Sequence, residues 1–175
     1  MILLHHCCVV CTPKALEFLR KEFGKAVSGL WYNPNIMPEE EHSRRLNALK
    51  EYAAQEKHAL LVDESIESGW VESAKKEEAE GRPRCAFCYY VRMKRTAQTA
   101  VKNGIPRFTT TLLSSPHQKH ELVIEAGKRA ASESGAEFYY RDFRPQFYEG
   151  KNEIYKRKLY MQKYCGCPAS GGTAC

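Results

Sequence analysis

The cysteines of this chain are grouped rather than scattered. All eight fall into four short stretches of sequence, namely Cys7, Cys8 and Cys11, then Cys85 and Cys88, then Cys165 and Cys167, and finally Cys175. Cysteines that fill a core as small apolar side chains would not be spaced in this way. The Cys-x-x-Cys spacing in the first two groups lets neighbouring sulfurs face one metal ion or one iron–sulfur cluster. The pattern predicts a metalloprotein with redox chemistry.

The first two groups can together hold a 4Fe–4S cluster. Cys7, Cys8 and Cys11 precede an expected helix, and Cys85 and Cys88 lie three residues apart on one face of another. The partial positive charge of a helix N-terminus stabilises thiolates and anionic clusters. A structural zinc ion held by two Cys-x-x-Cys pairs is the alternative. The adjacent Cys7–Cys8 pair, which a zinc site does not need, favours iron–sulfur.

The third group suggests a redox couple. Cys165 and Cys167 flank Gly166, and glycine permits the tight backbone of a strained, reducible disulfide. A second pair of metal ligands is the alternative for these two residues. Cys175 is the last residue, and terminal residues are seldom held rigidly, so we expect it to take no part in the chemistry.

One carboxylate and two histidines are further candidates. Asp142 is expected near the end of a strand, where it could donate a proton or bind a second metal ion. A salt bridge to Arg141 or Arg144 is the alternative for Asp142. His5 and His6 are expected on the first strand, where hydrogen-bonded packing is favoured over a direct role at the site.

The charge balance is compatible with RNA. The chain carries 27 Lys and Arg residues against 21 Asp and Glu residues, a net charge of +6. Tyrosines and cations are interleaved beside two cysteine groups, at Tyr89, Tyr90, Arg92, Lys94 and Arg95, and at Tyr155, Lys156, Arg157, Lys158, Tyr160, Lys163 and Tyr164. Cations hold phosphates and tyrosines stack on unpaired bases, whereas the alternative is a solvated basic face.

Strand and helix patterns alternate along the chain. Strands are expected over residues 2–6, 26–32, 59–63, 107–112 and 138–143. Helices are expected to begin at Thr12-Pro13, Pro38 and Ser115-Pro116, and to cover residues 64–81, 84–102 and 151–163. This alternation predicts an α/β fold with a mainly parallel sheet flanked by helices, which places sites at the carboxyl ends of the strands.

The length of 175 residues predicts a single domain, with residues 170–175 as a mobile tail. The N-terminus lacks the features of a signal peptide, and no apolar run approaches the roughly 20 residues that span a bilayer. We therefore expect a cytoplasmic protein, in which grouped thiols favour metal or redox roles over structural disulfides.

Six motifs together give the sequence a family resemblance. They are His5-His6-Cys7-Cys8-Val9-Val10-Cys11, Tyr32-Asn33-Pro34-Asn35-Ile36, Arg84-Cys85-Ala86-Phe87-Cys88, the segment from Thr109 to Pro116, Arg141-Asp142-Phe143-Arg144, and Tyr164-Cys165-Gly166-Cys167. In this order, over nearly the whole chain, they resemble the QueH type of epoxyqueuosine reductase.

The resemblance implies a Rossmann-like, HUP-like three-layer fold and the last step of queuosine biosynthesis. In that step the epoxide of epoxyqueuosine is reduced at the wobble position of tRNAs with a GUN anticodon. The family is independent of cobalamin and uses an iron–sulfur cluster, with a second metal nearby. On this basis Cys7, Cys8, Cys85 and Cys88 are assigned to the 4Fe–4S cluster, and Cys11 and Asp142 to a second metal ion, iron or zinc. Cys165 and Cys167 are assigned to electron storage, and Asp142 or a histidine to proton donation.

Three other functions are compatible with parts of the sequence. An iron–sulfur tRNA sulfurtransferase would carry an ATP-binding Ser-Gly-Gly-x-Asp-Ser loop after the first strand, where this chain has cysteines and valines. A zinc-stabilised RNA-binding module would be colourless and would perform no catalysis. A thiol–disulfide oxidoreductase would act without any metal. The electron donor is not identified by any motif.

Overall fold

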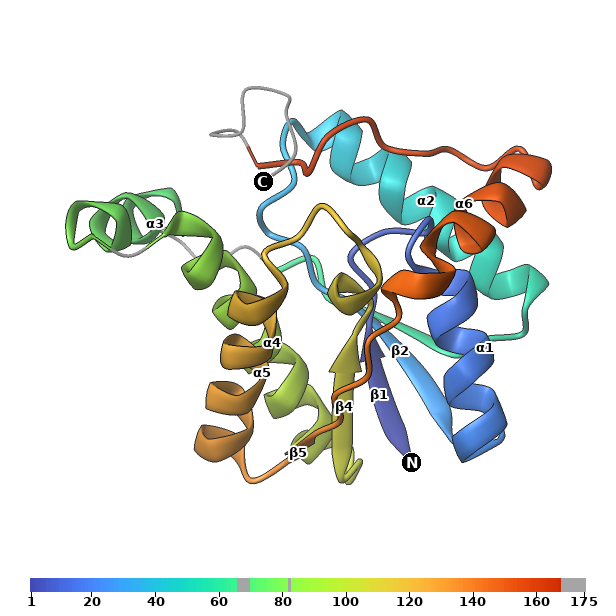
Figure 1. The fold of residues 1–175 in the computed structure, drawn as a ribbon, viewed down its shortest axis with the longest axis horizontal. Coiled ribbons are helices and arrows are strands. Elements are labelled where there is room, and N and C mark those ends of the chain that lie inside the picture. Colours follow the sequence, from blue (N-terminus) through green and yellow to red (C-terminus); the bar gives the residue numbers. More distant parts are fainter. Residues whose placement is uncertain (66–69, 82, 168–175) are drawn as a thin grey trace.

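The chain folds around a five-stranded parallel sheet (Figure 1). The computed structural model describes residues 1–65, 70–81 and 83–167. The strands are β1 (Ile2–His5), β2 (Val27–Trp31), β3 (Leu60–Val62), β4 (Arg107–Thr110) and β5 (Glu137–Phe138), in the spatial order β3-β2-β1-β4-β5. The central strand β1 pairs with β2 on one side and β4 on the other, in a register that places His5 beside Leu30 and Thr110. The predicted α/β fold with a parallel sheet is confirmed.

Helices cover both faces of the sheet. Six α-helices are present in the described part of the chain: α1 (Thr12–Phe23), α2 (Glu39–Gln55), α3 (Trp70–Ala79), α4 (Arg84–Lys102), α5 (His120–Ser134) and α6 (Phe147–Lys156). Figure 1 shows α1 and α6 on one side of the strands and the packed pair α4 and α5 on the other. Because both faces are covered, β1 is a continuous apolar run whose Ile2, Leu3 and Leu4 side chains are fully buried.

The strand order places a crevice beside β1. From β1 the chain adds β2 and then β3 on one side, and it then crosses back to add β4 and β5 on the other side of β1. Ligands of open α/β sheets bind where the order reverses, outside the carboxyl ends of the strands. In this chain the reversal lies between β1 and β4, and the segments that follow those two strands begin with His6 and Thr111.

The predicted end of one strand and the predicted start of one helix are wrong for local reasons. The strand expected over residues 138–143 is confined to Glu137–Phe138, since its ladder with β4 ends at the pair Phe108 and Phe138. Further on, the Asp142 carboxylate accepts a hydrogen bond from the Arg144 amide at 3.0 Å and closes a local turn. The helix expected from Ser115-Pro116 begins only at His120. The Ser115 hydroxyl accepts a hydrogen bond from the His117 amide at 3.2 Å, and it thereby closes a local turn in place of a helix cap.

Two further helix bounds differ from expectation. The helix expected over residues 151–163 runs from Phe147 to Lys156, and Lys158 then adopts a left-handed backbone with φ of 57° that stops it. Residue Cys11 takes the N-cap position of α1, whereas the Thr12 hydroxyl donates to the Cys8 carbonyl at 2.9 Å. Of the charged helix expected over residues 64–81, Trp70–Ala79 is helical, whereas residues 66–69 lie outside the described residues, as does the expected tail.

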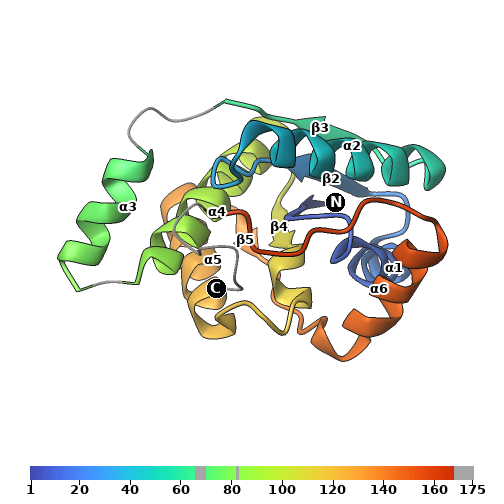
Figure 2. The ribbon, with the colours of Figure 1, turned by 90° about the horizontal axis from the view of Figure 1, so that it is seen from above.

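The chain after α6 runs back across the sheet. Figure 2, which views the molecule from above, shows residues 157–167 passing over the ends of the strands toward α4. We call residues 157–167 the C-terminal strap. Within the described ranges, no helix combines the length and the apolar character that crossing a membrane requires.

Candidate active site

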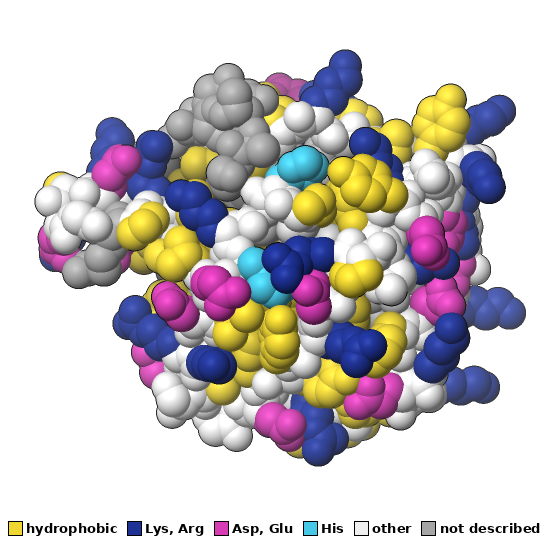
Figure 3. Space-filling model, viewed as in Figure 1, with side chains coloured by type: hydrophobic (Ala, Val, Ile, Leu, Met, Phe, Trp, Pro, Cys, Tyr) yellow, Lys and Arg dark blue, Asp and Glu magenta, His cyan; other side chains and the backbone are white. Residues whose placement is uncertain are grey.

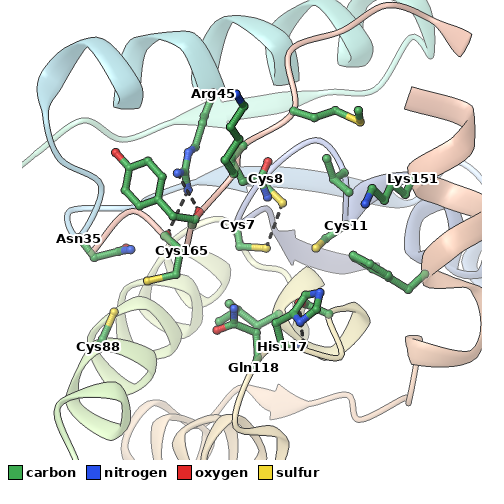
Figure 4. A pocket seen from close by; sticks show the side chains of 18 of the residues that line it. Cys7, Cys8, Cys11, Asn35, Arg45, Cys88, His117, Gln118, Lys151 and Cys165 are labelled. Carbon is green, nitrogen blue, oxygen red and sulfur yellow. Dashed lines mark hydrogen bonds between the residues drawn. The ribbon is translucent and has the colours of Figure 1, made fainter. Parts of the chain in front are cut away.

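A cavity of about 570 Å³ lies at the carboxyl edge of the sheet, at the reversal of strand order (Figure 4). Its walls come from the loop after β1, from α2, α4 and α6, from the loop after β4, and from the C-terminal strap. Five cysteines line it: Cys7, Cys8, Cys11, Cys88 and Cys165. Three cysteine groups that are distant in sequence therefore meet in one cavity, at the edge of the sheet where the topology predicts a site.

The first cysteine group forms a tight set of thiols. The sulfur atoms of Cys7, Cys8 and Cys11 all lie within 4.8 Å of one another. The pKa of the Cys8 thiol is held well below its usual value, because the thiols of Cys11 and Cys7 donate hydrogen bonds to its sulfur. Three convergent, mostly buried thiols are the donor set that soft metals and iron–sulfur clusters prefer. The residues present therefore fit a metal ion or cluster.

The structure does not separate Cys11 from its neighbours. The sequence assigned Cys7 and Cys8 to a cluster and Cys11 to a second metal ion, yet all three sulfurs share one small volume. Thr111 holds the backbone of the loop at Cys7. Its hydroxyl accepts a hydrogen bond from the Cys7 amide at 2.9 Å and donates one to the Cys7 sulfur at 3.2 Å. The cysteines of this loop can serve one metal centre or two adjacent centres.

The second cysteine group reaches the cavity through Cys88. As predicted, Cys85 and Cys88 occupy the first turn of α4. Cys88 lines the cavity, whereas Cys85 is half-buried and packs against the core without lining it. Burial raises the pKa of the Cys88 thiol. In Figure 4 the sulfurs of Cys88 and Cys165 lie on one side of the cavity, across from the first group.

Arg92 supplies a buried positive charge next to Cys88. Its guanidinium donates to the Cys88 carbonyl at 3.0 Å and to the Cys88 sulfur at 3.2 Å, one helical turn away. The side chain is 5% exposed, and no carboxylate of the described residues forms a salt bridge with it. An unpaired buried cation is costly unless it faces negative charge. The positive charge of Arg92 is therefore suited to interact with thiolates or with an anionic ligand in the cavity.

The cavity lining has one sign of charge. Four cations contribute to it, namely Arg45, Arg92, Lys151 and Lys163, and no Asp or Glu of the described residues does so. Of the four, Arg45 is balanced by an ion pair with the buried Glu41 carboxylate. A cavity with this lining favours anionic contents.

The C-terminal strap is fastened to α2 by a buried ion pair. Glu41 and Arg45, 1% and 3% exposed, lie one helical turn apart, and the Arg45 Nε donates to Glu41 at 2.7 Å. The Arg45 guanidinium also donates to the carbonyls of Tyr164 at 3.0 Å and Cys165 at 3.1 Å, while the Tyr160 hydroxyl donates to Glu41 at 2.6 Å. These bonds hold Cys165 in the wall of the cavity.

Cys165 and Cys167 occupy different environments in this arrangement. Cys165 lines the cavity, whereas Cys167 packs against the core without lining it. The Cys167 amide donates a hydrogen bond to the Cys165 sulfur at 3.3 Å. Gly166 between them has a φ of 97°, a conformation that favours glycine.

Asp142 lies away from the cavity. It does not line the cavity, and its carboxylate forms a salt bridge with Arg144 at 2.6 Å, which is the alternative that the sequence left open. The hydrogen bonds from Arg144 lower the pKa of Asp142 to about 2. At neutral pH this group is an anion and has no proton to donate.

His5 and His6 are fully buried and are occupied by hydrogen bonds. His6 Nδ1 is 2.9 Å from the Thr12 hydroxyl, and His6 Nε2 is 3.0 Å from His58 Nε2. Burial lowers the pKa of His5 to about 3 and that of His6 well below its usual value, so both are neutral. The ring pair needs Gly29, because a Cβ there would lie 2.6 Å from His6 Nε2. These features support packing, the interpretation that the sequence favoured for both histidines.

Sequence reasoning missed several residues of the site. Glu41 and Arg45 were not singled out, although a Glu–Arg spacing of four on a helix is a recognisable signal. Arg92 was seen only as part of a basic run, although it follows Cys88 by one turn. Asn35 was noted only within a motif; it lines the cavity, is 3% exposed, and its Oδ1 has no hydrogen-bond partner among the described residues.

Fold and site together define a class of protein. A doubly wound parallel sheet with a cation-lined, thiol-rich cavity at its topological switch point is typical of an α/β enzyme that uses a metal centre. The family model for "Epoxyqueuosine reductase QueH" matches residues 2–172. The chain belongs to the epoxyqueuosine reductase QueH family, whose members are oxidoreductases.

Individual relatives agree with this assignment. The chain is 36% identical over 166 residues to epoxyqueuosine reductase QueH of Dehalococcoides mccartyi, covering 95% of this chain and 90% of the relative. It is 31% identical over 175 residues to the QueH protein of Thermotoga maritima, covering 95% and 88%. It is 34% identical over 174 residues to that of Acinetobacter baylyi, covering 95% and 78%.

Proposed function

We propose that this chain reduces the epoxide of epoxyqueuosine to queuosine at the wobble position of tRNAs with a GUN anticodon, in the cytoplasm. The observation that carries the proposal is the convergence of three cysteine groups in one cavity of a chain that belongs to the QueH family. The cavity has about 570 Å³, and pockets of this size accommodate small-molecule and nucleoside groups.

The metal centre of the proposal is held by the cysteines of the cavity. Cys7, Cys8 and Cys11 supply one set of sulfurs, and Cys88 supplies another from α4, with Cys85 beside it on the same helix face. When bound, a 4Fe–4S cluster supplies single electrons, and a second metal ion, iron or zinc, supplies a Lewis acid. Arg92 balances part of the negative charge of the thiolates and keeps Cys88 oriented.

The reaction requires two electrons and two protons, because the epoxide oxygen leaves as water while both C–O bonds break. Cys165 and Cys167 can provide them by losing two S–H protons and forming an S–S bond. Cys165 lines the cavity, whereas Cys167 lies next to it without lining the cavity. In this order Cys165 can react with the contents of the cavity, and Cys167 can then form the S–S bond with Cys165. An external reductant of the thiol–disulfide exchange type then restores the dithiol.

Two further side chains support substrate binding. Asn35 lines the cavity, and its amide oxygen has no partner among the described residues, which suits a hydroxyl donor on the substrate's cyclopentane ring. His117 lines the cavity too, and Figure 4 shows its ring beneath the cysteines. Since Asp142 is outside the lining, our proposal has His117, rather than Asp142, pass protons from the thiols to the leaving oxygen.

The proposal is tested by anaerobic purification followed by a visible spectrum and a count of iron, sulfide and zinc. We expect a brown protein with about four irons and four sulfides per chain. We also expect it to convert epoxyqueuosine to queuosine in tRNA when a chemical reductant is supplied. A colourless zinc protein that stays inactive after iron–sulfur reconstitution would instead indicate a non-catalytic RNA-binding module.

Cys165→Ser tests the electron store separately. We expect turnover with the natural electron donor to fall by at least about 100-fold, because one of the two electron-carrying thiols is lost. The metal content should stay at the wild-type level if Cys165 is not a ligand. Full turnover of the variant with both the natural donor and a chemical reductant would exclude the redox role.

A further inference from the structure

The outer surface of α6 carries two exposed tyrosines beside the mouth of the cavity. Tyr148 and Tyr155 are 64% and 71% exposed, the highest values among the exposed large hydrophobic side chains. Large aromatic side chains that stay in water at this level are informative, since burying them would be favourable. Figure 3 shows hydrophobic side chains beside Lys and Arg side chains over this part of the molecule, with Asp or Glu side chains among them.

Helical geometry aligns these tyrosines with a lysine of the cavity. Tyr148, Lys151 and Tyr155 follow one another at spacings of three and four, so they lie on one face of α6. Lys151 lines the cavity, which places the face at its rim. The carboxylates of the helix, Glu149 and Glu153, fall on the opposite side by the same periodicity.

The two lysines at this rim are not engaged by carboxylates of the described residues. Lys151 and Lys163 both line the cavity, and neither forms a salt bridge with any carboxylate in the described ranges. By contrast, the carboxylates of α6 are engaged elsewhere: Glu149 lies 3.8 Å from Lys14, and Glu153 lies 2.7 Å from Arg157. The rim is thus a surface of free positive charge and exposed aromatic rings.

We propose that Tyr148, Lys151 and Tyr155 on α6, with Lys163 of the C-terminal strap, form a docking surface for single-stranded RNA next to the cavity. Tyrosine rings stack on unpaired bases whatever their sequence, and lysines bind the phosphates between them. The bases held on α6 are neighbours of the nucleotide whose modified base occupies the cavity. This inference rests on the proposed function, since it identifies the surface that receives the anticodon loop.

The signs of the charges at the rim favour RNA over a protein as the molecule that binds there. A protein partner would bring hydrogen-bonding and apolar groups of both charge signs, whereas the rim offers cations and aromatic rings without a carboxylate on the same helix face. A flipped-out nucleotide needs its backbone held while its base enters a pocket. Cations that flank the mouth and rings beside it meet both needs.

Binding of a synthetic anticodon stem-loop of a GUN-anticodon tRNA to the intact protein tests the surface. We expect Tyr148→Ala and Tyr155→Ala each to weaken binding about tenfold, because each removes a stacking platform. The matched variants Tyr148→Phe and Tyr155→Phe keep the ring and should bind like the wild type. We expect Lys151→Ala to lower the slope of log affinity against log salt concentration by about 0.7, as for one lost phosphate contact.

Two controls make the outcomes distinct. Lys102→Ala removes an exposed lysine at the far end of α4 and should leave the salt slope unchanged. Circular dichroism of each variant identifies any loss of fold. If the wild-type protein binds the stem-loop and both alanine variants bind equally well, the surface is wrong while the proposed function stands. If the wild-type protein neither binds the RNA nor reduces epoxyqueuosine tRNA, the proposed function fails and the inference fails with it.

Discussion

Cys8→Ser is expected to remove the bound metal centre and to lower epoxyqueuosine reduction by more than about 100-fold. The Cys8 side chain is 2% exposed, and its sulfur is the acceptor of hydrogen bonds from the thiols of Cys7 and Cys11. It is therefore the thiolate around which the group is built. Serine keeps the size of the side chain but replaces a soft sulfur by a hard oxygen, which iron–sulfur clusters bind poorly.

The measurement is an iron and sulfide count beside a turnover assay, both on anaerobically purified protein. Cys175→Ser is the matched control, because it makes the same chemical change at the cysteine that the sequence predicts to be uninvolved. The control should keep its metal and its activity. A Cys8→Ser protein with the full iron content and unchanged turnover would show that Cys8 is not a ligand.

The second large effect is expected at the buried ion pair of α2. Glu41→Ala should lower the free energy of unfolding by about 3–5 kcal/mol, because it leaves the Arg45 guanidinium buried without its carboxylate. Both partners are almost inaccessible to solvent, at 1% and 3% exposed, so water cannot replace the lost contact. Urea unfolding of the wild type and the variant measures the change.

A double variant separates stability from the placement of the C-terminal strap. Glu41→Leu combined with Arg45→Met removes both charges and should recover much of the lost stability. The bonds from Arg45 to the carbonyls of Tyr164 and Cys165 remain absent, however. We therefore expect the Cys165 thiol of the double variant to be alkylated several-fold faster than in the wild type.

Peptide mass spectrometry of the alkylated protein resolves Cys165 from the other cysteines. Arg44→Ala is the control on the same helix, because Arg44 also contacts Glu41, at 2.9 Å, but is 59% exposed. Exposed pairs contribute about 1 kcal/mol or less, so this variant should unfold like the wild type. Wild-type alkylation of Cys165 in the double variant would show that the ion pair does not position the strap.

The sequence predicted most of the fold because its signals are local. Alternating apolar runs and capped helices identified five strands and the α/β class, and the topological rule placed the first cysteine group at the carboxyl edge. The errors arose where tertiary contacts override propensity. Ser115 has the form of a helix cap, yet its hydroxyl closes a turn, and the segment after Lys156 has helical spacing but runs as an extended strap.

The residue types determined which chemistry this protein can perform, and the fold determined which of those residues lie next to one another. Sulfur is the donor for soft metals wherever it lies, so the cysteine groups alone indicated a metal and redox role and, with the other motifs, the family. Which sulfurs share a cavity depends on contacts between segments that are distant in the sequence. Short-range sequence patterns do not predict these contacts. Only the tertiary structure therefore placed Arg92 against Cys88, fastened Cys165 to Arg45, and paired Asp142 with Arg144 away from the cavity.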